Sequence, residues 1–281
     1  MISTKKAKKV GIINEDKVRH LIIPFLSVGK RGFKSKVCLV KVFLLVLKRM
    51  KTGCQWRELS IKEYFLEGEV CWQTIYYYFH KWSMDGSFKL VWINLLRQHK
   101  KQLDLSSVQL DGSHTPCKRG GLAVGYQGRK SCKTSNSLFL CDNRGQMLAV
   151  ASPQSGEHND LYNLPALFKE MLELLTDATI DYNGIFLNAD AGFDCEELKE
   201  TCLERGIELN VKPNARNIKS KKVQYRYFDE ELYKRRNKIE HANAWIDSFK
   251  ALIIRYEKRI ETWWALQWIA LITLYARKIK V

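Results

Sequence analysis

The chain has 281 residues, of which 46% are hydrophobic and 11% aromatic, so it can bury a sizeable core and is not expected to be globally disordered. Lys and Arg total 47 against 30 Asp and Glu, a formal net charge of +17 that favours a polyanionic partner, nucleic acid first and an anionic membrane surface second. No uncharged apolar run approaches the roughly 20 residues that span a bilayer, which argues against a membrane protein.

Cysteine usage and the N-terminus both favour the cytoplasm. The eight cysteines form no CxxC motif and no paired Cys/His spacing of the kind that binds zinc. The basic N-terminus leads into a short apolar run over 10–13 and then into charged residues, which is not the pattern of a signal peptide. We therefore expect a cytoplasmic protein with reduced thiols.

Residues 1–104 are expected to form a small, all-α domain. A dense apolar segment over 37–50 predicts one helix, and the segment 71–82 predicts another with a single buried stripe. The stripe consists of Trp72, Ile75, Tyr76, Phe79 and Trp82, and the residues facing away from it include Gln73, Thr74 and Lys81. This is the organisation of the second helix of a helix-turn-helix, whose exposed side can enter a major groove, and equally that of an ordinary helix in a bundle.

Residues 105–281 alternate strands and helices, so the predicted fold class is α/β. A short strand over 108–110 is expected to end on Asp111, and an apolar strand over 184–189 leads directly to Asp190. Parallel strands place functional groups at their carboxyl ends, which makes both aspartates candidates for a site. Either aspartate could instead cap a turn or a helix.

A helix over Tyr233–Asp247 carries the third candidate acid. At about 100° per residue, Tyr233, Arg236 and Glu240 project from one side of this helix. An apolar back that includes Trp245 and Ile246 projects from the other. A solvated charged face would give the same pattern, and Arg236 and Glu240 could simply form an i,i+4 ion pair worth about 0.5 kcal/mol.

The three acids are better explained together than apart. Asp111, Asp190 and Glu240 supply the hard oxygen ligands that hold Mg²⁺ or Mn²⁺. Two such ions about 4 Å apart can activate an attacking water or 3′-OH and stabilise the leaving oxygen of an in-line displacement. Cations around the acids would hold a phosphate backbone. The sequence offers such cations in two loops, as Arg129, Lys130, Lys221 and Lys222.

These residues resemble the bacterial insertion-sequence transposases of the DDE type. The most specific point of likeness is the family's Tyr-x2-Arg-x3-Glu-x6-Lys signature, which Tyr233, Arg236 and Glu240 match. Asp111 with its Gly-Ser flank, and Asp190 within Ala-Asp-Ala-Gly-Phe, match the surroundings of the family's two aspartates. The resemblance runs over nearly the whole chain.

One position departs from the signature. Its final Lys falls on Asp247, which places an anion on the side of the helix that carries Glu240. Lys250 and Arg255 are candidates for the DNA contact that this Lys would otherwise make. The Gly156–Asp160 segment, in contrast, falls in a family position.

The resemblance implies an RNase H-like catalytic core at 105–281, preceded by a helix-turn-helix-like DNA-binding domain at 1–104. Asp111, Asp190 and Glu240 would be the catalytic residues and would hold two Mg²⁺ or Mn²⁺ ions. Water would attack at the transposon end, and the freed 3′-OH would then attack target DNA in a single transesterification step.

The implied partner is double-stranded DNA, namely the terminal inverted repeats of a mobile element and the target DNA. Tyr233 and Arg236 would contact DNA near the scissile phosphate, because Arg grips phosphate and an aromatic ring stacks on an unstacked base. Since two ends must be paired, a homodimer in the DNA complex is a mechanistic expectation. The predicted DNA-binding residues are Tyr233, Arg236, Gln73, Thr74, Lys81, Arg129, Lys130, Lys221 and Lys222.

Two alternatives remain open. A transposase-derived DNA-binding regulator without catalysis would keep the basic surface but would not need the acids. A stand-alone, structure-selective nuclease could use the same core. The presence of all three acids favours an enzyme over the regulator.

Overall fold

Apolar helices build the N-terminal part of the chain. The computed structural model describes residues 13–29, 36–214 and 228–280. The dense apolar segment forms helix α2, which stops where Gly53 adopts a left-handed conformation (φ 70°) and donates its N–H to the carbonyl of Arg49. The helices of this part are α1 (Glu15–Lys17), α2 (Leu39–Thr52), α3 (Trp72–Met84) and α4 (Ser87–His99).

Helix α3 buries a slightly different face from the one predicted. Ile75, Phe79 and Trp82 are buried as expected, but Tyr76 is 36% exposed and Tyr78 is buried in its place. The buried positions 75, 78, 79 and 82 follow the i, i+3, i+4, i+7 pattern of a helix packed on one side. Trp56 covers Tyr76 from the outside, with ring centroids 5.3 Å apart.

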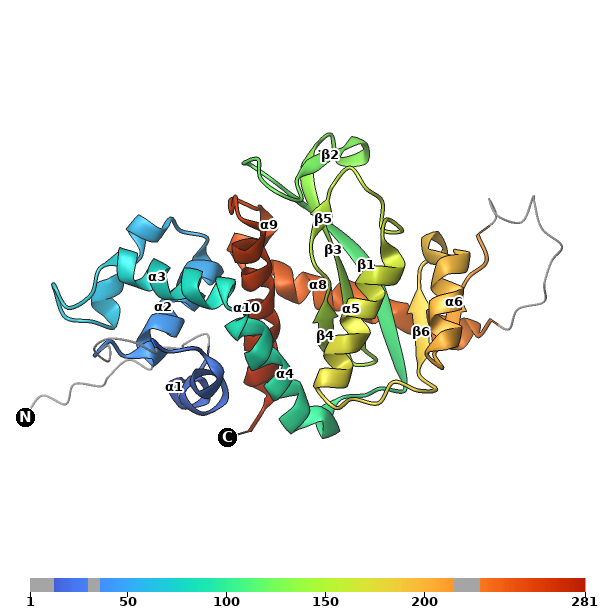
Figure 1. The fold of residues 1–281 in the computed structure, drawn as a ribbon, viewed down its shortest axis with the longest axis horizontal. Coiled ribbons are helices and arrows are strands. Elements are labelled where there is room, and N and C mark those ends of the chain that lie inside the picture. Colours follow the sequence, from blue (N-terminus) through green and yellow to red (C-terminus); the bar gives the residue numbers. More distant parts are fainter. Residues whose placement is uncertain (1–12, 30–35, 215–227, 281) are drawn as a thin grey trace, which may run out of the picture.

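One mixed sheet forms the centre of the rest of the chain (Figure 1). Its middle follows the order β4–β3–β1–β6–β7, in which β3 is antiparallel to β1 and to β4, whereas β6 and β7 run parallel to β1. The short strands β2 and β5 also pair with β3. The strands are β1 (Ser107–Pro116), β2 (Gly125–Gln127), β3 (Cys132–Asp142), β4 (Met147–Val150), β5 (Gln154–Ser155), β6 (Phe186–Ala189) and β7 (Glu208–Val211). The α/β class expected from the sequence is confirmed.

Helices pack around this sheet and continue its core into the N-terminal helices. The remaining helices are α5 (Leu164–Asp177), α6 (Glu196–Glu204), α7 (Glu230–Tyr233), α8 (Asn237–Asp247), α9 (Lys250–Ile253) and α10 (Ile260–Lys278). Helix α10 lies between the N-terminal helices and the sheet (Figure 1) and contacts α3, α4 and β4. Tyr275 on α10 donates to the carbonyl of His99, and Trp92 on α4 donates to that of Leu148 on β4, so hydrogen bonds join α10 to α4 and α4 to the sheet. Both sides of the predicted boundary at 104/105 therefore share one core, and the boundary itself stays a prediction.

The described residues contain no helix that combines the length and the apolar character needed to cross a membrane.

The segment after α9 is fastened to the loop after β1 by Arg255. This side chain is 1% exposed, and its guanidinium donates to the carbonyls of Leu122, Ala123 and Glu257 and to the hydroxyl of Ser135. Its backbone adds hydrogen bonds to Pro116 and Lys118 on the same loop. Arg255 therefore has a structural role here, and it is not available for the DNA contact considered from the sequence.

Replacing Arg255 with Met should lower the free energy of unfolding by about 2–4 kcal/mol, because it leaves the Ser135 hydroxyl and three partly buried carbonyls without their donor. The exposed Arg259, four residues on, gives a matched control, and Arg259→Met should cost less than about 0.5 kcal/mol. Urea unfolding of the two variants measures both effects. An equal decrease in the free energy of unfolding for the two variants would contradict a stabilising role for the hydrogen bonds of Arg255.

Candidate active site

Asp111 and Asp190 come together because their strands are parallel neighbours. Gln109 on β1 pairs with Asn188 on β6, so the two aspartates, each two residues further on, follow in the same register. Sequence reasoning expected the first strand to end at Asp111, and this is wrong: β1 continues to Pro116 by pairing with β3. Strand β6 stops at Ala189, so the edge of β1 that carries Asp111 is left open beside Asp190.

A ladder of buried amides lies directly below the two aspartates. Asn188 donates to the side-chain oxygen of Gln109 (2.8 Å), and Asn210 on β7 donates to that of Asn188 (2.8 Å). The same amides donate to the carbonyls of Leu232 (3.2 Å) and Asp229 (2.9 Å). The ladder therefore joins three strands and fixes the start of α7, the segment that leads to Arg236 and Glu240.

The predicted helix over Tyr233–Asp247 is helical throughout but not uniform. Tyr233 ends α7, a tighter 3-10 turn follows over Lys234–Arg236, and α8 begins at Asn237. Tyr233 is half-buried and packs against Phe228, with ring centroids 5.2 Å apart.

One side of this helix carries Arg236, Glu240, Asn243 and Asp247, at i, i+4, i+7 and i+11, and it borders Asp111. Asn243 Nδ2 lies 3.5 Å from Asp111 Oδ2. Glu240 accepts a hydrogen bond from Arg236 Nη2 (3.1 Å), and its side chain is 58% exposed. Among the residues that the structure describes, no three acidic, His or Cys side chains converge closely enough to hold a metal ion. The structure thus brings Asp111 and Asp190 together and places Glu240 on the adjoining helix face, turned toward Arg236.

The Asp111 carboxyl is held in an environment that disfavours its charge. Burial raises its pKa to about 6; the neighbouring carboxylates Asp160 and Asp190 add to the rise, whereas a hydrogen bond from Gly112 N–H and the charge of Arg236 oppose it. A carboxylate in this situation gains more from a bound cation than an exposed one would. The two carboxylates at this edge of the sheet are ligands of the type that hard divalent ions prefer.

Asp190 also performs the simpler role considered from the sequence. Its Oδ1 accepts the Gly192 N–H (2.7 Å) and so caps the turn over Ala191–Phe193. That bond fixes the orientation of the carboxylate and uses only one of its two oxygens.

Sequence reasoning did not select Asp160, although it noted the Gly156–Asp160 segment. Asp160 Oδ1 accepts a hydrogen bond from Asn136 (2.7 Å) and lies 3.7 Å from Nε2 of the buried His114. A Cβ added to Gly112 would lie 2.1 Å from the same oxygen, so this carboxylate can approach β1 only because residue 112 has no side chain. The glycine directly after Asp111 was the sequence signal for this contact.

The predicted DNA-binding residues are distributed over several parts of the molecule. Arg129 and Lys130 are exposed on a 3-10 turn after β2, and Lys130 Nζ donates to the carbonyl of His114 (2.6 Å). On α3, which lies on the far side of α10 from the sheet, Gln73 is exposed and Thr74 half-buried, while Lys81 Nζ donates to the carbonyl of Ser27 (3.0 Å) (Figure 1). Lys221 and Lys222 lie outside the described residues.

Comparison with known families accounts for most of the chain. Residues 103–274 match a family described as "Transposase DDE domain", and residues 16–92 match one described as "Putative transposase of IS4/5 family". Among curated proteins, none matches.

The solved structures that match are distant. One is a piggyBac transposase synaptic complex with hairpin DNA, with 8% identity over 94% of this chain and 72% of that one and a TM-score of 0.48. Another is a Mos1 transposase paired-end complex with the left transposon end, with 10% identity over 89% and 83% of the two chains and a TM-score of 0.29.

The contact between Gly112 and Asp160 predicts a steric effect. Gly112→Ala should lower the free energy of unfolding by about 1–3 kcal/mol, because the new methyl group collides with the Asp160 carboxylate. Asp160→Ala in the same chain should restore part of that loss. Gly120, whose Cβ would meet nothing within 4 Å, is the matched control. Additive losses in the double variant would contradict the contact.

The raised pKa of Asp111 predicts a pH-dependent stability. Because the folded-state pKa of about 6 exceeds the unfolded value of about 3.8, the metal-free protein should lose stability as pH rises from about 4 through about 6. Asp111→Asn removes this loss, so in EDTA at pH 8 it should raise the free energy of unfolding by up to about 3 kcal/mol and have no such effect below about pH 4.

Chemical denaturation across this pH range measures the difference. Glu200→Gln, at an exposed position on α6, is the control and should change stability by less than about 0.5 kcal/mol. A pH-independent effect of Asp111→Asn would contradict the raised pKa.

Proposed function

Because the chain belongs to the insertion-sequence DDE transposases, we propose that it cleaves DNA at the ends of its element with divalent metal ions and joins the freed 3′-OH to target DNA. The observation that supports this chemistry most directly is the register of β1 and β6, in which Asp111 and Asp190 follow a matched pair of residues. The strand order β4–β3–β1–β6–β7 supports an RNase H-like core, with three antiparallel strands followed by two parallel ones.

Asp111, Asp190 and Glu240 would hold two Mg²⁺ or Mn²⁺ ions. When bound, such ions lower the pKa of the attacking water and offset the charge that develops on the leaving oxygen. Glu240 can turn from Arg236 to join the two aspartates at small cost, because an exposed i,i+4 ion pair contributes only about 0.3–0.5 kcal/mol.

The residues around the acids would bind and orient the DNA. Arg236, once released by Glu240, has the planar donor pair that grips a phosphate, and Tyr233 one turn earlier offers a ring for stacking. Asn243 holds the carboxylate of Asp111 in place from α8. These contacts would keep the scissile phosphate at the open edge of β1.

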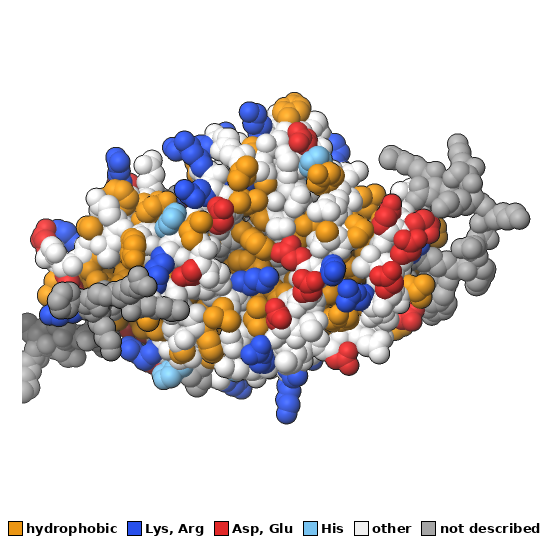
Figure 2. Space-filling view, in the orientation of Figure 1, with side chains coloured by type: hydrophobic (Ala, Val, Ile, Leu, Met, Phe, Trp, Pro, Cys, Tyr) orange, Lys and Arg blue, Asp and Glu red, His pale blue; other side chains and the backbone are white. Residues whose placement is uncertain are grey.

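The wider DNA surface would combine several elements. On the face seen in Figure 2, acidic side chains gather over α6, whereas Lys and Arg side chains are interspersed with acidic ones from the N-terminal helices to α5. We assign residues 1–104 to DNA binding, with α3 in the role of a recognition helix through Gln73, Thr74 and Lys81. Phosphate contacts from Arg129, Lys130, Lys221 and Lys222 would extend the surface.

The assembly follows from the reaction. Two transposon ends have to be held together, so the active form would be a homodimer on DNA, working in the cytoplasm. The terminal inverted repeats and the target would be its two DNA partners.

The test is strand cleavage of a supercoiled plasmid that carries the gene with its native flanks. With Mg²⁺ and purified protein, breaks should map to flanking inverted repeats, and EDTA should abolish them. Asp111→Asn and Asp190→Asn should each lower the cleavage rate by more than about a hundredfold, because even substitutions outside the ligand shell of a metal cost about 10–100-fold. Binding to the ends, measured by gel shift, should persist.

Glu200→Gln is the control and should cleave like the wild type. End binding by the wild type without any cleavage would instead favour the transposase-derived regulator. Breaks that do not map to the element's ends would favour a stand-alone nuclease.

A further inference from the structure

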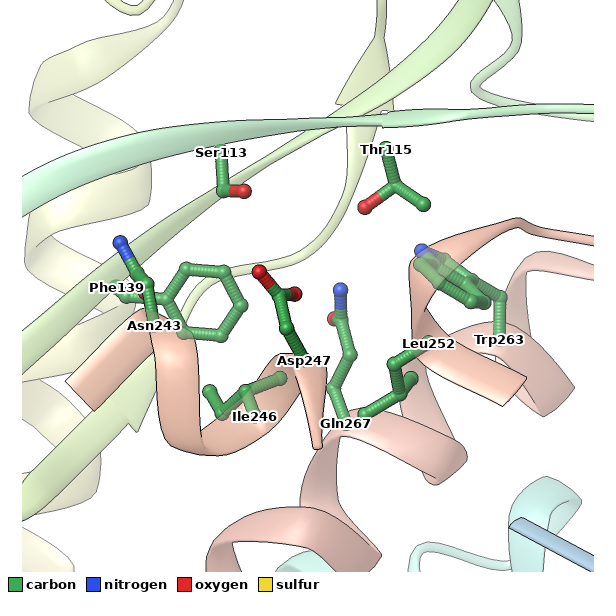
Figure 3. Close-up of a pocket in the computed structure, with 9 residues that line it drawn as sticks. All are labelled: Ser113, Thr115, Phe139, Asn243, Ile246, Asp247, Leu252, Trp263 and Gln267. Carbon is green, nitrogen blue, oxygen red and sulfur yellow. The ribbon is translucent and has the colours of Figure 1, made fainter. Parts of the chain in front are cut away.

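A small polar pocket lies beside the candidate active site, between β1, β3, α8 and α10 (Figure 3). Ser113 and Thr115 line it from β1, on the same face of the strand as Asp111. Asn243 and Asp247 line it from α8, and Gln267 lines it from α10. Figure 3 shows the Asp247 carboxylate and the Gln267 amide pointing into the space below the two hydroxyls.

The pocket is unusual because its buried polar atoms lack partners. Among the described residues, the buried side-chain atoms without a hydrogen bond include Asn243 Oδ1, Gln267 Oε1 and Trp263 Nε1, and all three residues line this pocket. Gln267 and Trp263 are 3% and 1% exposed, so neither can turn to bulk solvent. An unpaired buried acceptor costs about 1–3 kcal/mol, which indicates that a water or a ligand completes the site.

The two amides are held through their nitrogens, and their oxygens have no partner. Gln267 donates through Nε2 to Ser137 (2.9 Å), and Asn243 points its Nδ2 at Asp111 Oδ2 (3.5 Å). Each amide thus uses its donor elsewhere and leaves its acceptor free. The site therefore presents oxygen acceptors on several sides.

The charge of the pocket selects between possible ligands. Asp247 supplies the one carboxylate that lines it, and burial raises the pKa of this group, with the charge of Lys130 opposing the rise. An anion would be repelled by this carboxylate. A water molecule could also satisfy the amides, since Asp247 is exposed to solvent, and the experiment below distinguishes a water from a cation.

We propose that this pocket binds a hard divalent metal ion, additional to the catalytic ions, through the Asp247 carboxylate and the side-chain oxygens of Asn243 and Gln267. Carboxylate, amide and hydroxyl oxygens are the ligands that such ions prefer, and Ser113 and Thr115 stand where they can complete the set. Divalent ions also keep bound waters, and one such water can accept the N–H of Trp263.

The ion would act on the active site through Asn243. Withdrawing electrons from Oδ1 makes the Nδ2–H groups of the same amide better donors, and these groups face Asp111. An occupied pocket would therefore hold the Asp111 carboxylate more firmly and leave one net positive charge beside it. This consequence, unlike the binding itself, rests on the proposed function.

The test uses Mn²⁺ as the probe and removes the catalytic acids first. In the full chain with Asp111→Asn and Asp190→Asn, one Mn²⁺ should bind, counted by the loss of the free-ion signal in electron paramagnetic resonance. Adding Asp247→Asn, which keeps the shape of the side chain, should weaken that binding at least about tenfold. Adding Glu173→Gln, at an exposed position on α5, should leave it unchanged.

A second variant distinguishes the loss of a metal ligand from damage to the fold. Gln267→Glu adds a carboxylate to the pocket and should tighten Mn²⁺ binding on the order of tenfold, which a damaged fold cannot do. Failure of the double variant to bind Mn²⁺, or binding that is the same with and without Asp247→Asn, would overturn the proposal in favour of an ordered water. Because no DNA is present, this result is independent of whether the protein cleaves transposon ends.

Discussion

The candidate site depends on a row of buried amides that crosses three parallel strands. Gln109, Asn188 and Asn210 can satisfy one another only in one register, and a shift by a single residue would leave buried polar groups unpaired. That register is what sets Asp111 beside Asp190. The same amides bond to the backbone at Asp229 and Leu232, so they also fix where the helical segment with Arg236 and Glu240 begins.

A second constraint comes from α10, which is buried on nearly all sides. Helix α10 packs against the sheet on one side and against the N-terminal helices on the other. Contacts therefore run from α3 through α10 to α8, the helix that carries Glu240. The hydrogen bonds of Arg255 to Leu122 and Ala123 join the segment before α10 to the loop after β1. The open edge of β1 is therefore framed by rigid elements, as a site for in-line chemistry requires.

The sequence predicted the fold class, the position of Asp190 after a strand and the polar side of the helix that carries Glu240, because each follows from a local period or turn signal. It placed Asp111 at a strand end, whereas β1 continues to Pro116 by pairing with β3. It could not predict the amide ladder, since the pairing of residues 109, 188 and 210 is set by tertiary packing. Trp245 was expected on the apolar back of the helix, yet it is 42% exposed under the ammonium of Lys278. The role of Arg255 was misjudged for the same reason, because nothing local shows that its guanidinium donates to three carbonyls and a hydroxyl.

The electrostatics of the site link metal binding to DNA binding. The chain carries a formal charge of +17. Burial raises the pKa of Asp111, and the carboxylates of Asp160 and Asp190 add to that rise. The same carboxylates would repel a phosphate. Under the proposed function, cations bound by these acids would remove that repulsion. Glu240 would exchange Arg236 for a metal ion, and Arg236 would become free for the phosphate. This exchange would complete the set of metal ligands and would free Arg236 for DNA. Metal binding and DNA binding should therefore each favour the other.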